Sequence, residues 1–256
     1  PMCGIAGALN LDGSPLTDHA LVWRMTRALA HRGPDVEGVH LEGPAGLGHR
    51  RLAILDLSPG GHQPMRDSAS GRVLVYNGEI YNFRELREAA QPQAGEFFTN
   101  CDTEVLLKIA EFDDTRWLHG LNGMFAFGLW DPTRRELLLG RDRLGIKPLY
   151  WTVAGGRFLF ASEIKALLAV PEVSRRIRPE ALPEYLAYRS LAGEETLLAG
   201  IRQCRPGHVL RIRPGEALPR AACWWDDLSA GPWRDGLSGP VEEQFATLFG
   251  SAVAYR

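Results

Sequence analysis

The segment 124–130 constrains the fold more than any other part of the sequence, because both of its alternating faces are apolar. It reads Met-Phe-Ala-Phe-Gly-Leu-Trp and is followed by turn-forming residues at 131–134. Successive side chains of a β-strand point to opposite faces of the sheet, so a strand of this composition should be covered on both faces. We therefore expect a layered fold in which a sheet lies between other elements.

Other short apolar segments bounded by turn residues predict further strands, and the hydrophobic content of 45% over 256 residues is sufficient for a core. Strands are predicted at 3–9, 47–55, 72–76, 136–140, 149–153 and 158–161. Apolar residues at helical spacing predict helices at 16–29, 83–90, 102–112 and 241–255. The arrangement expected is antiparallel strands sandwiched between helices.

Charge and cysteine content exclude several classes of function. The 29 Lys and Arg against 31 Asp and Glu give a formal net charge of -2, so we expect no nucleic-acid partner. No apolar stretch approaches the roughly 18 residues that span a bilayer, which predicts a cytoplasmic protein with no membrane partner. Cys3, Cys101, Cys204 and Cys223 form no CxxC pair, so neither a metal site nor a disulfide framework is expected.

Cys3 stands close to the start of the sequence, and a thiol at a chain terminus can react in a way that an internal thiol cannot. A cysteine that is itself the terminal residue can use its own α-amine as a base. That amine titrates near about 7.7–8.0, whereas a lysine side chain near about 10.4 is protonated at neutral pH. Most cysteines near a terminus have no such role, so other residues must support this interpretation.

Six motifs supply that support because of the order in which they occur. They are MCGI (2–5), HRGPD (31–35), GHRRLAILD (48–56), YNGEIYN (76–82), DTE (102–104) and GRDRLGIKPLY (140–150). Together they resemble the glutaminase half of glutamine-dependent asparagine synthetases, which are class II amidotransferases. The resemblance extends from residue 2 to about 225. It implies an α+β fold of the N-terminal-nucleophile hydrolase type, a four-layer αββα sandwich with antiparallel sheets.

The resemblance also implies how the amide of glutamine would be cleaved. Cys3 would be the nucleophile and would form a thioester, with its terminal amine moving the proton. The side-chain amide of Asn77 and the backbone N–H of Gly78 would form the oxyanion hole. Asn supplies two donors, and Gly lets the backbone approach without a Cβ in the way.

Substrate binding is implied for a second group of residues. Arg51 would hold the α-carboxylate of glutamine through its planar donors, Glu79 and Asp102 would receive the α-ammonium, and Ile54 and Asn77 would complete the substrate site. Taken singly, these residues have structural explanations: Arg51 as a surface strand residue, Asp102 as a helix N-cap and Asn77-Gly78 as a hairpin turn.

Four further motif residues are more simply explained as structural. His31, Arg32 and Asp35 are expected to form a buried hydrogen-bond network that shapes the active-site loop, and the same holds for His49.

Pro1 and Met2 precede Cys3, whereas the family that the sequence resembles uses this cysteine as the mature N-terminus. With the two residues attached, the Cys3 nitrogen is an amide without useful basicity, and activity should fall or vanish.

The resemblance divides the chain into a glutaminase domain at 3–215, a linker at 216–240 and, at 241–256, the first helix leading to an ATP-pyrophosphatase synthetase domain. No cofactor is expected in this chain, and Mg-ATP is implied for the synthetase domain. The partners implied are glutamine and that synthetase domain, in cis or in trans, and a homodimer is compatible with the sequence. The apolar face of the last helix, with Trp224 and Trp225, is expected to dock on the synthetase domain.

Three alternatives stay open at this level. Amidotransferases of sugar-phosphate or purine biosynthesis are related, but their motif looks like Gly-Gln-Asp or Gly-Tyr-Asp at the position where this chain has Gly33-Pro34-Asp35. The acceptor of the ammonia could be aspartate or another carboxylate, such as that of a specialised metabolite. The chain could also be a catalytically silent interaction module.

Overall fold

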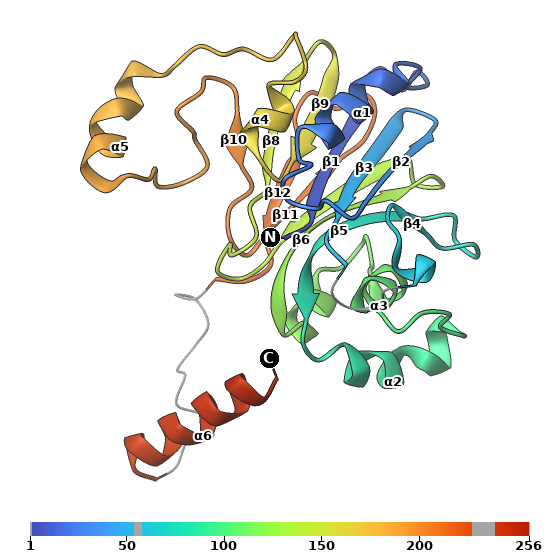
Figure 1. Cartoon of the computed structure of the whole chain (residues 1–256), viewed down its shortest axis with the longest axis vertical. Helices are drawn as coiled ribbons and strands as arrows, with labels where there is room; N and C mark the ends of the chain where they lie inside the picture. The colour runs from blue at the N-terminus through green and yellow to red at the C-terminus, as the bar shows by residue number, and fades with distance from the viewer. Residues whose placement is uncertain (1, 54–57, 227–238, 256) are drawn as a thin grey trace.

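The computed structural model describes residues 2–53, 58–226 and 239–255 (Figure 1). Two antiparallel sheets, each with six strands among the described residues, stack face to face. The first has the order β10-β8-β9-β1-β3-β2, made by Arg202–Gln203, Tyr150–Ala154, Arg157–Ala161, Gly4–Asn10, Ala45–Arg51 and Val36–Glu42. The second has the order β12-β11-β7-β6-β5-β4, made by Arg220–Cys223, His208–Ile212, Glu136–Arg141, Gly123–Asp131, Val73–Ile80 and Met65–Arg66.

Helices cover the outer faces of both sheets (Figure 1). α1 (His19–Arg27) and α4 (Ile164–Leu167) pack against the first sheet, and α3 (Asp102–Ile109) packs against the second, with α2 (Phe83–Ala94) beside it. The predicted αββα sandwich is confirmed. Three short 3-10 helices at Pro59–Gly61, Arg116–Gly120 and Pro179–Ala181, together with α5 (Leu182–Tyr188) and α6 (Val241–Ala254), complete the described elements.

β6 shows why the sequence is apolar on both faces of this strand. Ala126 and Trp130 belong to the core between the sheets, whereas Phe125, Phe127 and Leu129 belong to the core under α3. The two-sided burial expected from the sequence is therefore confirmed. At the same level Gly128 leaves room for the Phe160 ring of the other sheet, since a Cβ there would lie 2.7 Å from that ring.

Several elements differ from the sequence-based expectation. β5 continues to Ile80 where a strand ending at residue 76 was predicted, and α1 is shorter than 16–29 because the side chain of Asp18 caps it by accepting a hydrogen bond from Leu21 N at 3.0 Å. The pattern did not predict β2, β4, β10, β11, β12 or α5. β2 is a half-buried edge strand, so it lacks the continuous apolar run that marks the central strands.

The sheet also continues into the segment predicted as a linker. β12 pairs with β11, and Trp224 is 3% exposed, donates from Nε1 to Arg141 O at 3.2 Å and stacks on Phe125. Trp224 therefore packs on the domain itself, which corrects the expectation that it docks on another domain. Residues 227–238 lie outside the described residues, and the division of the chain into domains stays a prediction.

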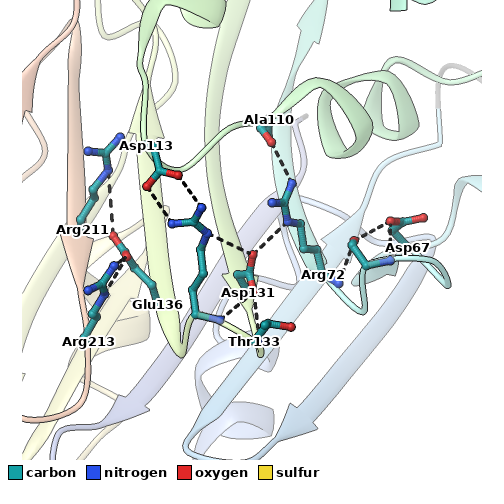
Figure 2. A network of polar contacts seen from close by, with 11 residues as sticks. Asp67, Arg72, Ala110, Asp113, Asp131, Thr133, Glu136, Arg211 and Arg213 are labelled. Carbon is teal, nitrogen blue, oxygen red and sulfur yellow. Dashed lines mark hydrogen bonds and ion pairs between the residues drawn. The ribbon is translucent and has the colours of Figure 1, made fainter. Parts of the chain in front are cut away.

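One end of the second sheet is held by a polar network (Figure 2). Asp131, at the end of β6, accepts from Arg72 Nε at 3.0 Å and from the backbone N–H groups of Thr133 and Arg134 at 3.0 Å each. Glu136, at the start of β7, accepts from Arg213 Nε at 2.7 Å. Both carboxylates are buried, and each has a charged partner.

Candidate active site

The opposite end of the same strands opens into a cavity of about 340 Å³. It contains every predicted site residue that the structure describes: Cys3, Arg51, Asn77, Gly78, Glu79 and Asp102. They come from both sheets and from α3, so the sandwich brings together residues that are far apart in sequence. Ile54 lies outside the described residues, and its role stays a prediction.

Cys3 stands immediately before β1, a strand that has β3 on one side and β9 on the other. Arg32 Nε donates to Cys3 O at 2.9 Å, and Leu52 N donates to Sγ at 3.4 Å. Burial raises the pKa of the thiol, although the Leu52 contact and the charges of Arg51 and Lys147 oppose this effect. These surroundings alone therefore favour a protonated thiol, and activation requires a base.

A network around Glu163 fixes the backbone of Cys3. Glu163 Oε1 accepts from Arg32 Nη1 and His31 Nε2, each at 2.9 Å. Burial opposes ionisation, but the hydrogen bonds from Arg32, His31 and Lys165 lower the pKa of Glu163 to about 2. The structural role predicted for His31 and Arg32 is confirmed, with the difference that the His31 side chain is 49% exposed.

Asp35 and His49 also have structural roles. Asp35 accepts from Ala53 N at 2.8 Å, which holds the loop beside Cys3, but it is exposed and not buried as predicted. His49 is buried and its Nε2 lies 3.1 Å from Tyr76 O, so it connects the two sheets. Burial lowers the pKa of His49 to about 3, and the ring is neutral at physiological pH.

Asn77 and Gly78 lie inside β5, so the hairpin-turn explanation is wrong. Asn77 is 1% exposed, and its Nδ2 has no hydrogen-bond partner among the residues described. A buried donor without a partner is costly, and because Asn77 lines the cavity, a ligand bound there can supply the acceptor.

The backbone N–H of Gly78 points to the same open edge of β5. β5 pairs with β6 residue by residue without a bulge, so N–H groups two residues apart share a direction. Tyr76 N donates to Gln63 Oε1 at 2.6 Å and Ile80 N to Asp102 Oδ2 at 3.0 Å, both away from β6. Gly78 lies between them, and a Cβ there would be 2.4 Å from Met124 O, so only Gly fits.

The charged residues expected to bind the substrate are buried or half-buried in the cavity. Asp102 is the first residue of α3, whose N-cap is Cys101, so Asp102 is not the N-cap. Its Oδ2 accepts from Tyr76 OH at 2.8 Å, and burial raises its pKa. Arg51 is 5% exposed at the end of β3 and donates to Ser58 O at 3.2 Å, so it is not a surface residue. Glu79 lines the cavity and is half-buried.

Sequence reasoning missed Lys147, which lines the cavity and is 4% exposed. Its Nζ donates to Met2 Sδ at 2.9 Å, and burial lowers its pKa. The sequence signal was its place in the motif 140–150, which served only for the family resemblance. Gln63 and Cys101 also line the cavity without having been predicted there.

Residues 2–53, 58–226 and 239–255 contain no cluster of three or more His, Cys, Asp or Glu side chains placed to hold a metal ion. They contain no helix with the length and apolar character needed to cross a membrane.

Comparison with known sequences matches residues 2–225 to a family described as "Glutamine amidotransferase domain". Glutamine-hydrolyzing asparagine synthetase 3 of Bacillus subtilis (strain 168) is 39% identical over 213 residues, which is 82% of this chain and 34% of that protein. A protein named amidase chry2 from Gibberella zeae is 36% identical over 235 residues, 87% of this chain and 34% of that protein. The chain thus spans about a third of the length of these relatives.

Comparison with solved structures supports the fold. Glutamine phosphoribosylpyrophosphate amidotransferase from B. subtilis, solved with ADP and GMP, superposes with a TM-score of 0.64 over 87% of this chain and 49% of that one, at 20% identity. At this identity the likeness concerns the fold alone, a sandwich of two antiparallel sheets.

Proposed function

The chain belongs to the class II glutamine amidotransferase domain family, and on that premise we propose that it hydrolyses the side-chain amide of glutamine through Cys3. The observation that carries the proposal is the unpartnered Nδ2 of buried Asn77, beside the outward N–H of Gly78, in the cavity that contains the Cys3 thiol. Two donors from adjacent residues that line one cavity suit the oxyanion of a tetrahedral intermediate.

The reaction requires a chain that begins at Cys3. Its α-amine takes the proton of the thiol, and Sγ attacks the amide carbon of glutamine. The carbonyl oxygen becomes an oxyanion held by Asn77 and Gly78. The C–N bond then breaks, the α-amine gives its proton to the leaving nitrogen, and ammonia and a thioester result. Water hydrolyses the thioester to glutamate and regenerates the thiol.

The ends of the substrate are recognised by charge. Arg51 binds the α-carboxylate, and Glu79 with Asp102 binds the α-ammonium. Burial raises the pKa of Asp102, so an arriving ammonium group favours the ionised form that pairs with it. A free amino acid carries both charges, whereas glutamine within a peptide does not, which explains selectivity for the free substrate.

Ammonia would be passed to an ATP-dependent synthetase domain, in cis or in trans, that binds Mg-ATP. This part of the proposal rests on relatives that carry the name asparagine synthetase and of which this chain matches only 34%. Aspartate is the acceptor that this name suggests. A relative named an amidase leaves other carboxylate acceptors as a second candidate.

The alternative of a silent module is favoured by one observation, the raised pKa of the Cys3 thiol with Met2 attached. Mass spectrometry of protein from its native host discriminates between the two. A terminus at Cys3 supports the enzyme, and a retained Met2 supports the silent module.

The direct test is labelling with the electrophilic glutamine analogue 6-diazo-5-oxo-norleucine, followed by peptide mapping. Addition at Cys3 supports the proposal. Cys101 also lines the cavity, so Cys101→Ala is the matched control and should label as the unchanged protein does. Labelling at Cys101, Cys204 or Cys223 with Cys3 unmodified would refute the assignment.

A further inference from the structure

Lys147 is a buried cation for which the mechanism above has no use. It is 4% exposed, and among the residues described its Nζ donates to a single acceptor, the thioether of Met2 at 2.9 Å. A thioether is a weak acceptor, and an ammonium group without a carboxylate partner is expensive to bury. A fold that keeps such a group in place needs another reason to do so.

The backbone around Lys147 is built to hold this position. Asp142, fully buried, accepts from Lys147 N at 3.0 Å and also from the N–H groups of Leu144 and Ile146. Arg141 Nε donates to Lys147 O at 2.8 Å. The loop is therefore anchored on both sides of the lysine, and the ammonium is placed in the cavity before any substrate arrives.

That placement puts the ammonium in the cavity that also contains Cys3. Lys147 contacts Met2, the residue joined to the Cys3 nitrogen, and its charge acts on Cys3 in the direction that favours the thiolate. Removal of Met2 creates an α-amine on Cys3, in the cavity that Lys147 also lines. The charges of Arg51 and Asp102 also act on Cys3, and those of Arg32, Glu79 and Asp142 act on Lys147. Of these, Arg32 touches Cys3 through its carbonyl oxygen, and no carboxylate is seen to pair with the Lys147 ammonium in the described part of the chain.

We propose that Lys147 is a further residue of the hydrolysis site, whose ammonium group keeps Cys3 in the form that has lost one proton and can attack the amide. The inference rests on the proposed glutamine hydrolysis. Lys147 transfers no proton itself. A nearby cation disfavours a protonated α-amine and favours a thiolate, so both effects lower the pH at which Cys3 becomes reactive.

The test uses the chain starting at Cys3 and compares Lys147→Met with Lys147→Arg. Two rates are followed against pH: glutamine hydrolysis as kcat/KM, and alkylation of Cys3 by iodoacetamide without substrate. In Lys147→Met the acid limb of both profiles should shift to higher pH by about one unit. At pH values below the limb this is roughly a tenfold loss of rate. The rates should converge at high pH, and Lys147→Arg should keep the original limb.

Lys108→Met is the matched control, since Lys108 lies on α3 and donates to Ala94 O and Glu96 O, outside the cavity. An unmoved limb in Lys147→Met, a loss that is equal at all pH values, or a limb that also moves in Lys147→Arg would overturn the inference. If Lys147→Met does not fold, Lys147→Gln carries the same expectation.

Alkylation separates the two proposals. An unchanged chain that alkylates at Cys3 but releases no ammonia contradicts the proposed function. Hydrolysis by that chain with an unmoved limb in the variants contradicts only the role of Lys147.

Discussion

The two ends of strands β5 and β6 differ in how their buried carboxylates, on one side, and their cavity-lining donors, on the other, are paired. At one end, Asp131 and Glu136 are buried and paired with arginines (Figure 2). At the other, Asn77 Nδ2 has no partner among the described residues and Lys147 has only a thioether. A buried carboxylate paired with an arginine holds the sheet, whereas an unpartnered donor that lines the cavity is available to a substrate. The same sheet thus carries a structural end and a reactive end.

The largest effect is expected at the structural end. Asp131→Ala should lower the free energy of unfolding by about 3–5 kcal/mol, because Arg72 would lose its buried carboxylate partner. Urea denaturation measures this, and kcat of the folded fraction should not change. A variant as stable as the unchanged protein would break the comparison.

Asn77→Ala should show the reverse pattern. The loss of an oxyanion donor should raise the barrier by about 2.7–4 kcal/mol, which appears in kcat, while stability is retained because the donor has no partner to lose. Steady-state kinetics and a urea curve on the same preparation test both halves. A large loss of stability with normal kcat would show that Asn77 supports the fold and not the reaction.

Arg51→Ala should weaken glutamine binding by about 2 kcal/mol, the low end of the cost of leaving one charge of a pair without its partner. Arg51→Lys should recover part of the loss, since the charge returns without the planar donors. The readout is KM, and an unchanged KM in Arg51→Ala would refute this binding role.

The smallest effect concerns Glu163, a paired carboxylate at the reactive end. Its pKa is lowered to about 2 in the folded chain, so its pairing stabilises the fold above its unfolded pKa and is lost as the pH falls toward 2. Glu163→Gln should cost about 1 kcal/mol at pH 7, because the group is partly exposed. The difference from the unchanged protein should shrink below about pH 5. Denaturation curves at several pH values measure it, and a pH-independent difference would contradict the ion-pair explanation.

Sequence patterning predicted the strands and helices whose buried residues recur at a regular spacing. β6 was predicted because both of its faces are apolar, and each face does pack in a different core. β2 was not predicted, because a half-buried edge strand has no continuous apolar run. β12 was missed because it is an exposed edge strand among Pro-rich residues that are typical of linkers.

The site was predicted from the order of the motifs, and the structure adds the contacts between residues of different motifs. Cys3, Arg51, Asn77 and Asp102 meet in one cavity only because the two sheets stack. The lack of a partner at Asn77 Nδ2 depends on how the surrounding residues fold. The burial of Lys147 against Met2 depends on a contact between residues more than a hundred positions apart. No local pattern records such contacts.

The central claim is that Cys3, with its own α-amine, hydrolyses glutamine at the reactive end of the sheet. The most direct measurement compares two forms of the chain, one beginning at Cys3 and one retaining Met2, for release of ammonia and glutamate from glutamine. The account predicts equal amounts of the two products from the Cys3 form and none above background from the Met2 form. Equal turnover by both forms would contradict it, because the amide nitrogen of the longer chain cannot act as the base.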